Sequence, residues 1–258
     1  MPLQLDSRAI KAEARSLLHI GEVNPFKLTL FYLLISLVLD TVNAGVSYAI
    51  ESAGGFTVLS FSFVSILIGL VSLVLNAGYF CYCFGILRRE QMPYDSLFDA
   101  FPFAGKVILL SIVEGIFIFL WSMLFVIPGI VAAYRYSFAM LNLCENPDLG
   151  VMEALDLSKR QTNGYKMQLF LLQLSFIGYQ LAAALIAVLY EYAIISFLPD
   201  SLPGVLLGTL IYSVLAAGVG VYLTPYLNLS ICRFYLLATG NQAGGAEPPH
   251  TDPWDTQF

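Results

Sequence analysis

Long apolar segments separated by short polar ones fill most of this chain. A helix needs about 20 apolar residues to cross a bilayer. The stretch from Val107 to Cys144 is too long for one crossing and just long enough for two, with Ile127-Pro128-Gly129 near its middle. Proline lacks a backbone donor and glycine tolerates turn conformations, so we predict a turn here between two antiparallel spans. The alternative is one long helix kinked at Pro128.

The whole pattern predicts an all-α, polytopic membrane protein with six transmembrane helices arranged as three hairpins. The spans are expected at about residues 27–50, 57–87, 106 to the turn, the turn to 144, 166–195 and 205–237. Pro225 is expected to kink the last span. A cytosolic amphipathic helix is expected before each hairpin, at about residues 6–20, 94–101 and 151–160.

The first amphipathic helix can be capped by Ser7 and carries basic residues away from an apolar stripe. The stripe consists of Ile10, Ala14, Leu17 and Leu18. Such a helix can lie on an anionic inner leaflet, or it can pack on the cytosolic face of the protein itself.

We predict a single transmembrane domain over residues 1–238, followed by a disordered Gly/Pro-rich tail at 239–258. The domain divides into units at about 6–90, 93–145 and 147–238. Each unit has an amphipathic helix, a lysine (Lys27, Lys106 or Lys166) and a hairpin, which indicates an internal repeat. The alternative is three unrelated hairpins.

The distribution of charge supports six spans with both termini in the cytosol. In that arrangement no lysine or arginine lies in an outer loop, and the outer turns carry only Glu51 and Asp200. This satisfies the positive-inside rule. A single kinked helix at Pro128 would instead place Lys159 and Lys166 outside.

Composition agrees with a membrane location, because 58% of the residues are apolar and 12% are charged, against about 25% charged in a soluble domain. The four cysteines lie near expected cytosolic helix ends, so no disulfide framework is predicted. With two histidines, no set of metal ligands is recognised. We expect no cofactor, and the net charge of −6 does not suggest nucleic-acid binding.

Several motifs in the second and third units resemble a bacterial integral-membrane family known as domain of unknown function 975. They are Ile127-Pro128-Gly129, Tyr134-Arg135-Tyr136-Ser137, Asn146-Pro147-Asp148-Leu149-Gly150, Glu153-Ala154-Leu155, Ser158-Lys159, Gly164-Tyr165-Lys166, Phe170, Leu174-Ser175-Phe176-Ile177-Gly178-Tyr179, Pro225-Tyr226 and Phe234-Tyr235. A tryptophan is usual where Tyr179 stands. The resemblance implies a bacterial cytoplasmic membrane protein and implies no particular activity.

Ionisable residues within a span are costly, so they are the candidate functional residues. Helix rise places Arg135, Asp40 and Glu191 at one level in the outer half of the membrane. Glu114 and Gln173 are expected at a deeper level, and polar groups near the middle come from Asn76 and Gln180. These residues form either a polar cavity between hairpins or an ion pair and amides that fix helix packing.

No nucleophile with a base and no phosphate loop is recognised, so we expect no enzyme activity. The first hypothesis is a non-enzymatic membrane protein that binds or moves a small or lipidic molecule through an inter-hairpin polar cavity. The second is a membrane scaffold or accessory subunit, and an intramembrane enzyme is third. The expected partners are membrane lipids and a second copy or another membrane protein.

Overall fold

The computed structural model describes residues 6–18, 25–52, 56–90, 92–190, 192 and 201–244, and every regular element in these residues is helical. This confirms the all-α prediction. The elements are α1 (Ser7–Leu17), α2 (Pro25–Ser52), α3 (Phe56–Leu87), the 3₁₀ helices η1 (Tyr94–Phe98) and η2 (Phe101–Phe103), α4 (Ala104–Leu124), α5 (Val126–Tyr136), α6 (Ala139–Glu145), α7 (Val151–Gln161), α8 (Lys166–Leu174), α9 (Ile177–Leu189) and α10 (Leu202–Gly244).

Within the described residues, five helical stretches are long and apolar enough to cross a bilayer. They are Pro25–Ile50, Ser62–Leu87, Tyr94–Leu124, Val126–Glu145 and Leu202–Gly240. A sixth is obtained if α8 and α9, which meet at an angle of 51°, are counted together as one broken span. These lengths and compositions are those of a multi-pass helical membrane protein, as predicted.

The interruption predicted at residues 127–129 lies instead at Phe125, whose backbone is extended with φ −161° and ψ 154°. Pro128 falls in the first turn of α5, where a missing N–H leaves no intrahelical bond unmade. Gly129 serves packing, because an added Cβ would come within 3.0 Å of the Cα atom of Ser122 on α4. The chain is therefore not one helix kinked at Pro128.

A second interruption separates α5 from α6, in what was predicted as one span, and a hydroxyl from α7 fills it. The Ser158 hydroxyl donates to the carbonyl oxygen of Arg135 at 2.9 Å and accepts from the backbone N–H of Phe138 at 3.1 Å. A side chain inserted into the backbone ladder in this way is a recognised cause of a helix break. The interruption therefore depends on α7 and not on a proline or glycine.

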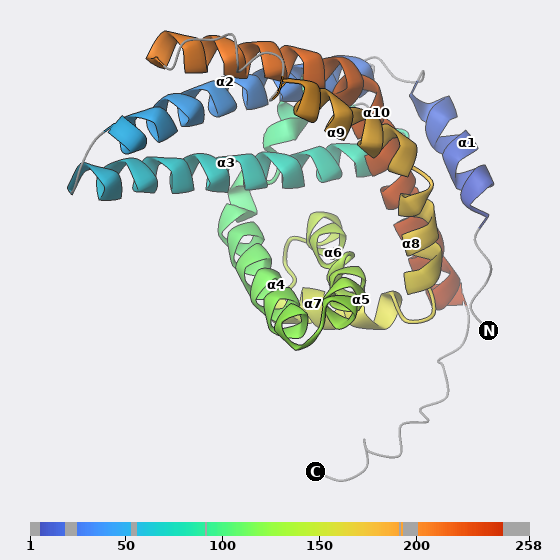
Figure 1. Ribbon diagram of the computed structural model, residues 1–258. Coiled ribbons are helices and arrows are strands. Elements are labelled where there is room, and N and C mark those ends of the chain that lie inside the picture. The colour runs from blue at the N-terminus through green and yellow to red at the C-terminus, as the bar shows by residue number, and fades with distance from the viewer. Residues whose placement is uncertain are drawn as a thin grey trace.

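The helices form two adjoining groups, seen in Figure 1. α2, α3 and the first part of α10 lie side by side, and α10 then bends and runs past α8. Pro225 stands inside α10, where a bend was predicted. The other group contains α4 to α7. Large side chains that are fully buried in one core cluster include Tyr79, Phe138, Phe176, Phe234 and Tyr235.

The first helix packs on the protein itself. Its cap is the carboxylate of Asp6, which accepts from the backbone N–H of Arg8 at 2.8 Å, and not the predicted Ser7. The apolar stripe is buried against α10 and α8. The ammonium group of Lys11 donates to the carbonyl oxygen of Ser175 at 3.3 Å. This burial and the nearby Arg15 lower the pKa of Lys11.

Two other boundaries differ from the predictions. The amphipathic segment at 94–101 is built from two 3₁₀ helices, and α7 forms as expected over Val151–Gln161. α10 continues to Gly244, past the start of the predicted tail, and residues 245–258 lie outside the described residues.

Candidate functional site

Four of the predicted site residues are scattered over separate helices. Asp40 on α2, Asn76 on α3 and Gln180 on α9 are exposed, while Glu114 on α4 is half-buried. In the part of the chain that the structure describes, no hydrogen bond or ion pair joins any of them to another. Glu191 lies outside the described residues. Among the described residues no ion pair joins Arg135 to Asp40, and their shared level in the membrane stays a prediction.

Arg135 and Gln173 are brought to one interface, between α5 and α8. The hydroxyl of Tyr134 donates to the side-chain oxygen of Gln173 at 2.8 Å, and its ring meets the edge of Phe170 at 5.8 Å. Arg135 follows Tyr134 and lies next to Lys166, the first residue of α8. The backbone of Arg135 also lies beside α7, because the Thr162 hydroxyl lies 3.2 Å from the carbonyl oxygen of Arg135.

Arg135 and Lys166 share an open pocket of about 100 Å³ between α4, α5 and α8. Its wall is otherwise made by Trp121, Pro128, Val131 and Ala132. We call this the cationic pocket. The sequence reasoning missed Lys166 and Trp121 as lining residues, because the lysine was interpreted only as a marker of the cytosolic end. No spacing in the sequence could have found them, since α8 reaches α5 only through the fold of α7.

The cationic pocket carries two positive charges and no carboxylate among its lining residues. The positive charge of Arg135 repels the positive charge of Lys166. The ion pairs within the described residues lie elsewhere, at Arg88–Glu145, Lys159–Asp156 and Arg233–Glu13. The amino end of α8, with its partial positive charge, also begins at Lys166. The pocket therefore has the electrostatics of an anion site with largely apolar walls.

Two side-chain hydroxyls of α7 contact the backbone of Arg135 and hold it in place. Its carbonyl oxygen accepts from the Ser158 hydroxyl at 2.9 Å and faces the Thr162 hydroxyl as well. Ser158 and Thr162 are 0% and 1% exposed. Buried hydroxyls of this kind need partners, so the interruption after α5 and the position of the Arg135 backbone are fixed together.

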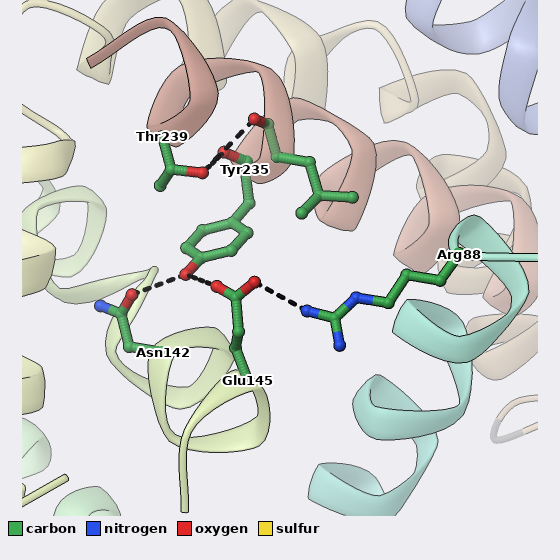
Figure 2. A network of polar contacts seen from close by, with 6 residues as sticks. Arg88, Asn142, Glu145, Tyr235 and Thr239 are labelled. Carbon is green, nitrogen blue, oxygen red and sulfur yellow. Dashed lines mark hydrogen bonds and ion pairs between the residues drawn. The ribbon is translucent and has the colours of Figure 1, made fainter. Parts of the chain in front are cut away.

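A second polar cluster joins the ends of three helices and is shown in Figure 2. Glu145 on α6 accepts from Arg88, just after α3, at 2.8 Å and from the hydroxyl of Tyr235 on α10 at 2.6 Å. The same hydroxyl lies 2.8 Å from the side-chain oxygen of Asn142. Both carboxylate oxygens of Glu145 are thus engaged, so this cluster serves as a tie between helices.

Residues 123–242 match the family model described as protein of unknown function DUF975. The resemblance recognised from the sequence motifs is confirmed over this segment. The DUF975 segment contains Arg135, Lys166 and the α7 hydroxyls, whereas Trp121 precedes it. No curated protein and no solved structure matches the chain significantly. The family description assigns no activity, so a function for this chain has to be argued from its own geometry.

Proposed function

We propose that this chain is a non-enzymatic, multi-pass protein of a bacterial cytoplasmic membrane that binds an anionic lipid through its head group in the cationic pocket. Its spans would form three hairpins, α2 with α3, α4 with α5–α6, and α8–α9 with α10. For the middle pair, Phe117 on α4 stacks on Tyr136 of α5 with ring centroids 5.7 Å apart. Lys106 at the start of α4 reaches the carbonyl oxygen of Pro147, just after α6, at 2.6 Å. Both contacts are those expected of an antiparallel pair.

The observation that carries the proposal is the presence of two cations in one largely apolar pocket without an acid. Charges taken out of bulk water are costly unless a partner compensates them. A phosphate diester suits the pair, because a guanidinium can donate two parallel hydrogen bonds to it and an ammonium acts as a compact point charge. The apolar walls and Trp121 suit the glycerol and acyl region of the same molecule.

The test is thermal stability of the purified full chain in detergent, with added phosphatidylglycerol, phosphatidylcholine or inorganic phosphate. Phosphatidylglycerol should raise the apparent Tm of the wild type more than phosphatidylcholine does, and Lys166→Gln should lose this difference. The matched control is Lys159→Gln on α7, because Lys159 is exposed and pairs with Asp156. This control should respond as the wild type does.

Three results would count against the proposal. Equal stabilisation by the two phospholipids would refute an anionic head-group site. An equal response to inorganic phosphate would assign the pocket to a soluble anion. Without added lipid, Lys166→Gln should be no less stable than the wild type, because one of two like charges is removed. A large loss of stability would mean that Lys166 has a structural role.

One observation favours the second candidate function, a membrane scaffold or accessory subunit. An apolar groove of about 310 Å³ runs between α2 and α10. It is lined by Leu30, Leu33, Leu34, Leu37, Val214, Ala217, Gly218 and Val221. Small residues such as Ala217 and Gly218 permit close approach of another helix. Native mass spectrometry of the wild type should then show a stable oligomer, and a monomer would remove this candidate.

A further inference from the structure

The turn between α4 and α5 is made of large apolar side chains that lie on the surface. Phe125 alone separates the two helices. The five consecutive side chains of Met123–Ile127 are each between 62% and 75% exposed, and we name them the apolar tip. No charged residue occurs in the sequence between Glu114 and Arg135. A turn in water rarely exposes such a continuous apolar surface, so hydrocarbon is the medium that suits the apolar tip.

The opposite end of α5 lies close to water. The Ser158 hydroxyl on α7 contacts the carbonyl oxygen of Arg135 at 2.9 Å. The next residue of α7, Lys159, pairs with Asp156, and both of these side chains are exposed. Exposed charges of this kind are stable in water and costly in hydrocarbon. The membrane surface therefore passes close to the backbone of Arg135.

The helix between these two points is too short to cross a bilayer. Arg135 is ten residues after Phe125, which corresponds to about 15 Å of helix. The hydrocarbon core of a bilayer is about 30 Å thick. α4 runs beside α5 over this length, with Phe117 stacked on Tyr136. The apolar tip therefore ends near the middle of the membrane when Arg135 lies at its surface.

We propose that α4 and α5 form a re-entrant hairpin, which enters the bilayer from the cytosolic side and turns back at the apolar tip within the hydrocarbon. The partner of the tip is then the acyl chains of lipid. The inference rests on the proposed membrane location and changes the middle hairpin from a crossing into a re-entrant one. The chain enters and leaves on the same side in both cases, so the proposed cytosolic position of α7 is unchanged.

This arrangement also gives the cationic pocket a depth. Arg135 and Lys166 would lie at the cytosolic head groups, and Arg135 would not lie in the predicted outer half of the membrane. Trp121 and Pro128 line the same pocket on the side of the apolar tip. The pocket would then be oriented as a phospholipid is, with its charges at the surface and its apolar wall toward the interior.

The depth of a tryptophan in lipid vesicles measures how far the hairpin reaches. The chain has 2 tryptophans, Trp121 and Trp254, and both are replaced by Phe. Phe125→Trp is then made in this background, with Met167→Trp, next to Lys166, as the control. Each protein is reconstituted in phosphatidylcholine that is brominated either near the end of the acyl chain or near its ester group. Phe125→Trp should lose more fluorescence to chain-end bromine, and Met167→Trp should lose more to bromine near the ester. Stronger quenching of Phe125→Trp by bromine near the ester would place the turn at a membrane surface and overturn the proposal.

Cysteine labelling in cells gives a second measurement. Val126→Cys should add no reaction with a membrane-impermeant maleimide to that of the wild type, before or after the cells are opened, because a thiol in hydrocarbon does not ionise. Glu51→Cys, near the end of α2, is the control and should react in intact cells. Reaction of Val126→Cys in either condition overturns the proposal. Neither measurement uses the response of Lys166→Gln to phosphatidylglycerol, so lipid binding and the reach of the hairpin can fail independently.

Discussion

Removing the Ser158 hydroxyl is the most direct test of how α7 shapes the interruption between α5 and α6. Ser158→Ala removes the acceptor of the Phe138 N–H at 3.1 Å and one donor to the Arg135 carbonyl at 2.9 Å. Ser158 and Phe138 are both fully buried, so no water replaces the lost acceptor. The Arg135 carbonyl keeps Thr162 as a neighbour, at 3.2 Å. The main cost is therefore one buried and unsatisfied N–H.

A buried donor without a partner costs about 1–3 kcal/mol. For a chain of this size, 1 kcal/mol corresponds to about 2–4 °C, so we expect the apparent Tm to fall by about 5 °C. Tm can be followed by tryptophan and tyrosine fluorescence of the purified protein in detergent. The matched control is Ser137→Ala, because the Ser137 hydroxyl lies at the same break but bonds within its own helix, to Tyr134 at 2.9 Å. The control should lose about 1 °C or less.

Equal Tm values for Ser158→Ala and Ser137→Ala would refute this reasoning. That result would mean that Phe138 recovers the regular helical bond to the Tyr134 carbonyl, and that α5 and α6 can join without α7. The break would then be a preference of the α5–α6 sequence and not an effect of the inserted hydroxyl. Any change in the position of Arg135 would then have a cause separate from the break.

Three further outcomes are expected. Gly78→Ala should lower Tm by several degrees, because the new Cβ meets the backbone carbonyl of Leu97, whereas Gly69→Ala on the same helix meets nothing within 4 Å and should be neutral or stabilising. Tyr235→Phe should cost about 1–3 kcal/mol in thermal unfolding, since its hydroxyl contacts both a carboxylate and an amide on α6. Lys159→Cys should resist a membrane-impermeant maleimide in intact cells and react after lysis; labelling in intact cells would overturn the proposed topology.

The sequence predicted helix type and most helix ends because the signals are local. Apolar length alone located α2 and α3, and the Arg88-Arg89 pair marks the end of α3 at Leu87. Composition therefore supported a count of spans, and the described residues contain five or six helical stretches long and apolar enough to cross a bilayer. These features need no knowledge of which helices touch.

The turn near Pro128 shows where local reasoning fails. A proline interrupts a helix only where its N–H would be needed, and in the first turn that group has no intrahelical partner. Pro128 is therefore compatible with α5, and the interruption falls at Phe125. Gly129 is required by its contact with Ser122, which belongs to another helix. Sequence motifs of proline and glycine identify the region of a turn better than the residue.

The bend between α8 and α9 has no local signal. Leu174-Ser175-Phe176 contains neither proline nor glycine, yet the helices meet there at 51°. Phe176 is fully buried against Tyr226, with ring centroids 5.0 Å apart, and Lys11 donates to the Ser175 carbonyl. Contacts from α10 and α1 thus stabilise the bend. The depth predicted for Arg135 stays a prediction, because α5 is uninterrupted from Val126 to Tyr136 and the break lies beyond Arg135.

The two polar clusters differ in a way that bears on function. In the cluster of Figure 2, both oxygens of Glu145 accept a hydrogen bond. The negative charge that links α3, α6 and α10 is therefore already paired, with Arg88. In the cationic pocket, Arg135 and Lys166 face each other without an acid among the lining residues. Two like charges without a counter-charge destabilise the fold. A bound anion removes this cost only in the conformation in which the pocket is formed, so it favours that conformation. Anion binding should therefore couple to the contact of α8 with α5, which both line the pocket.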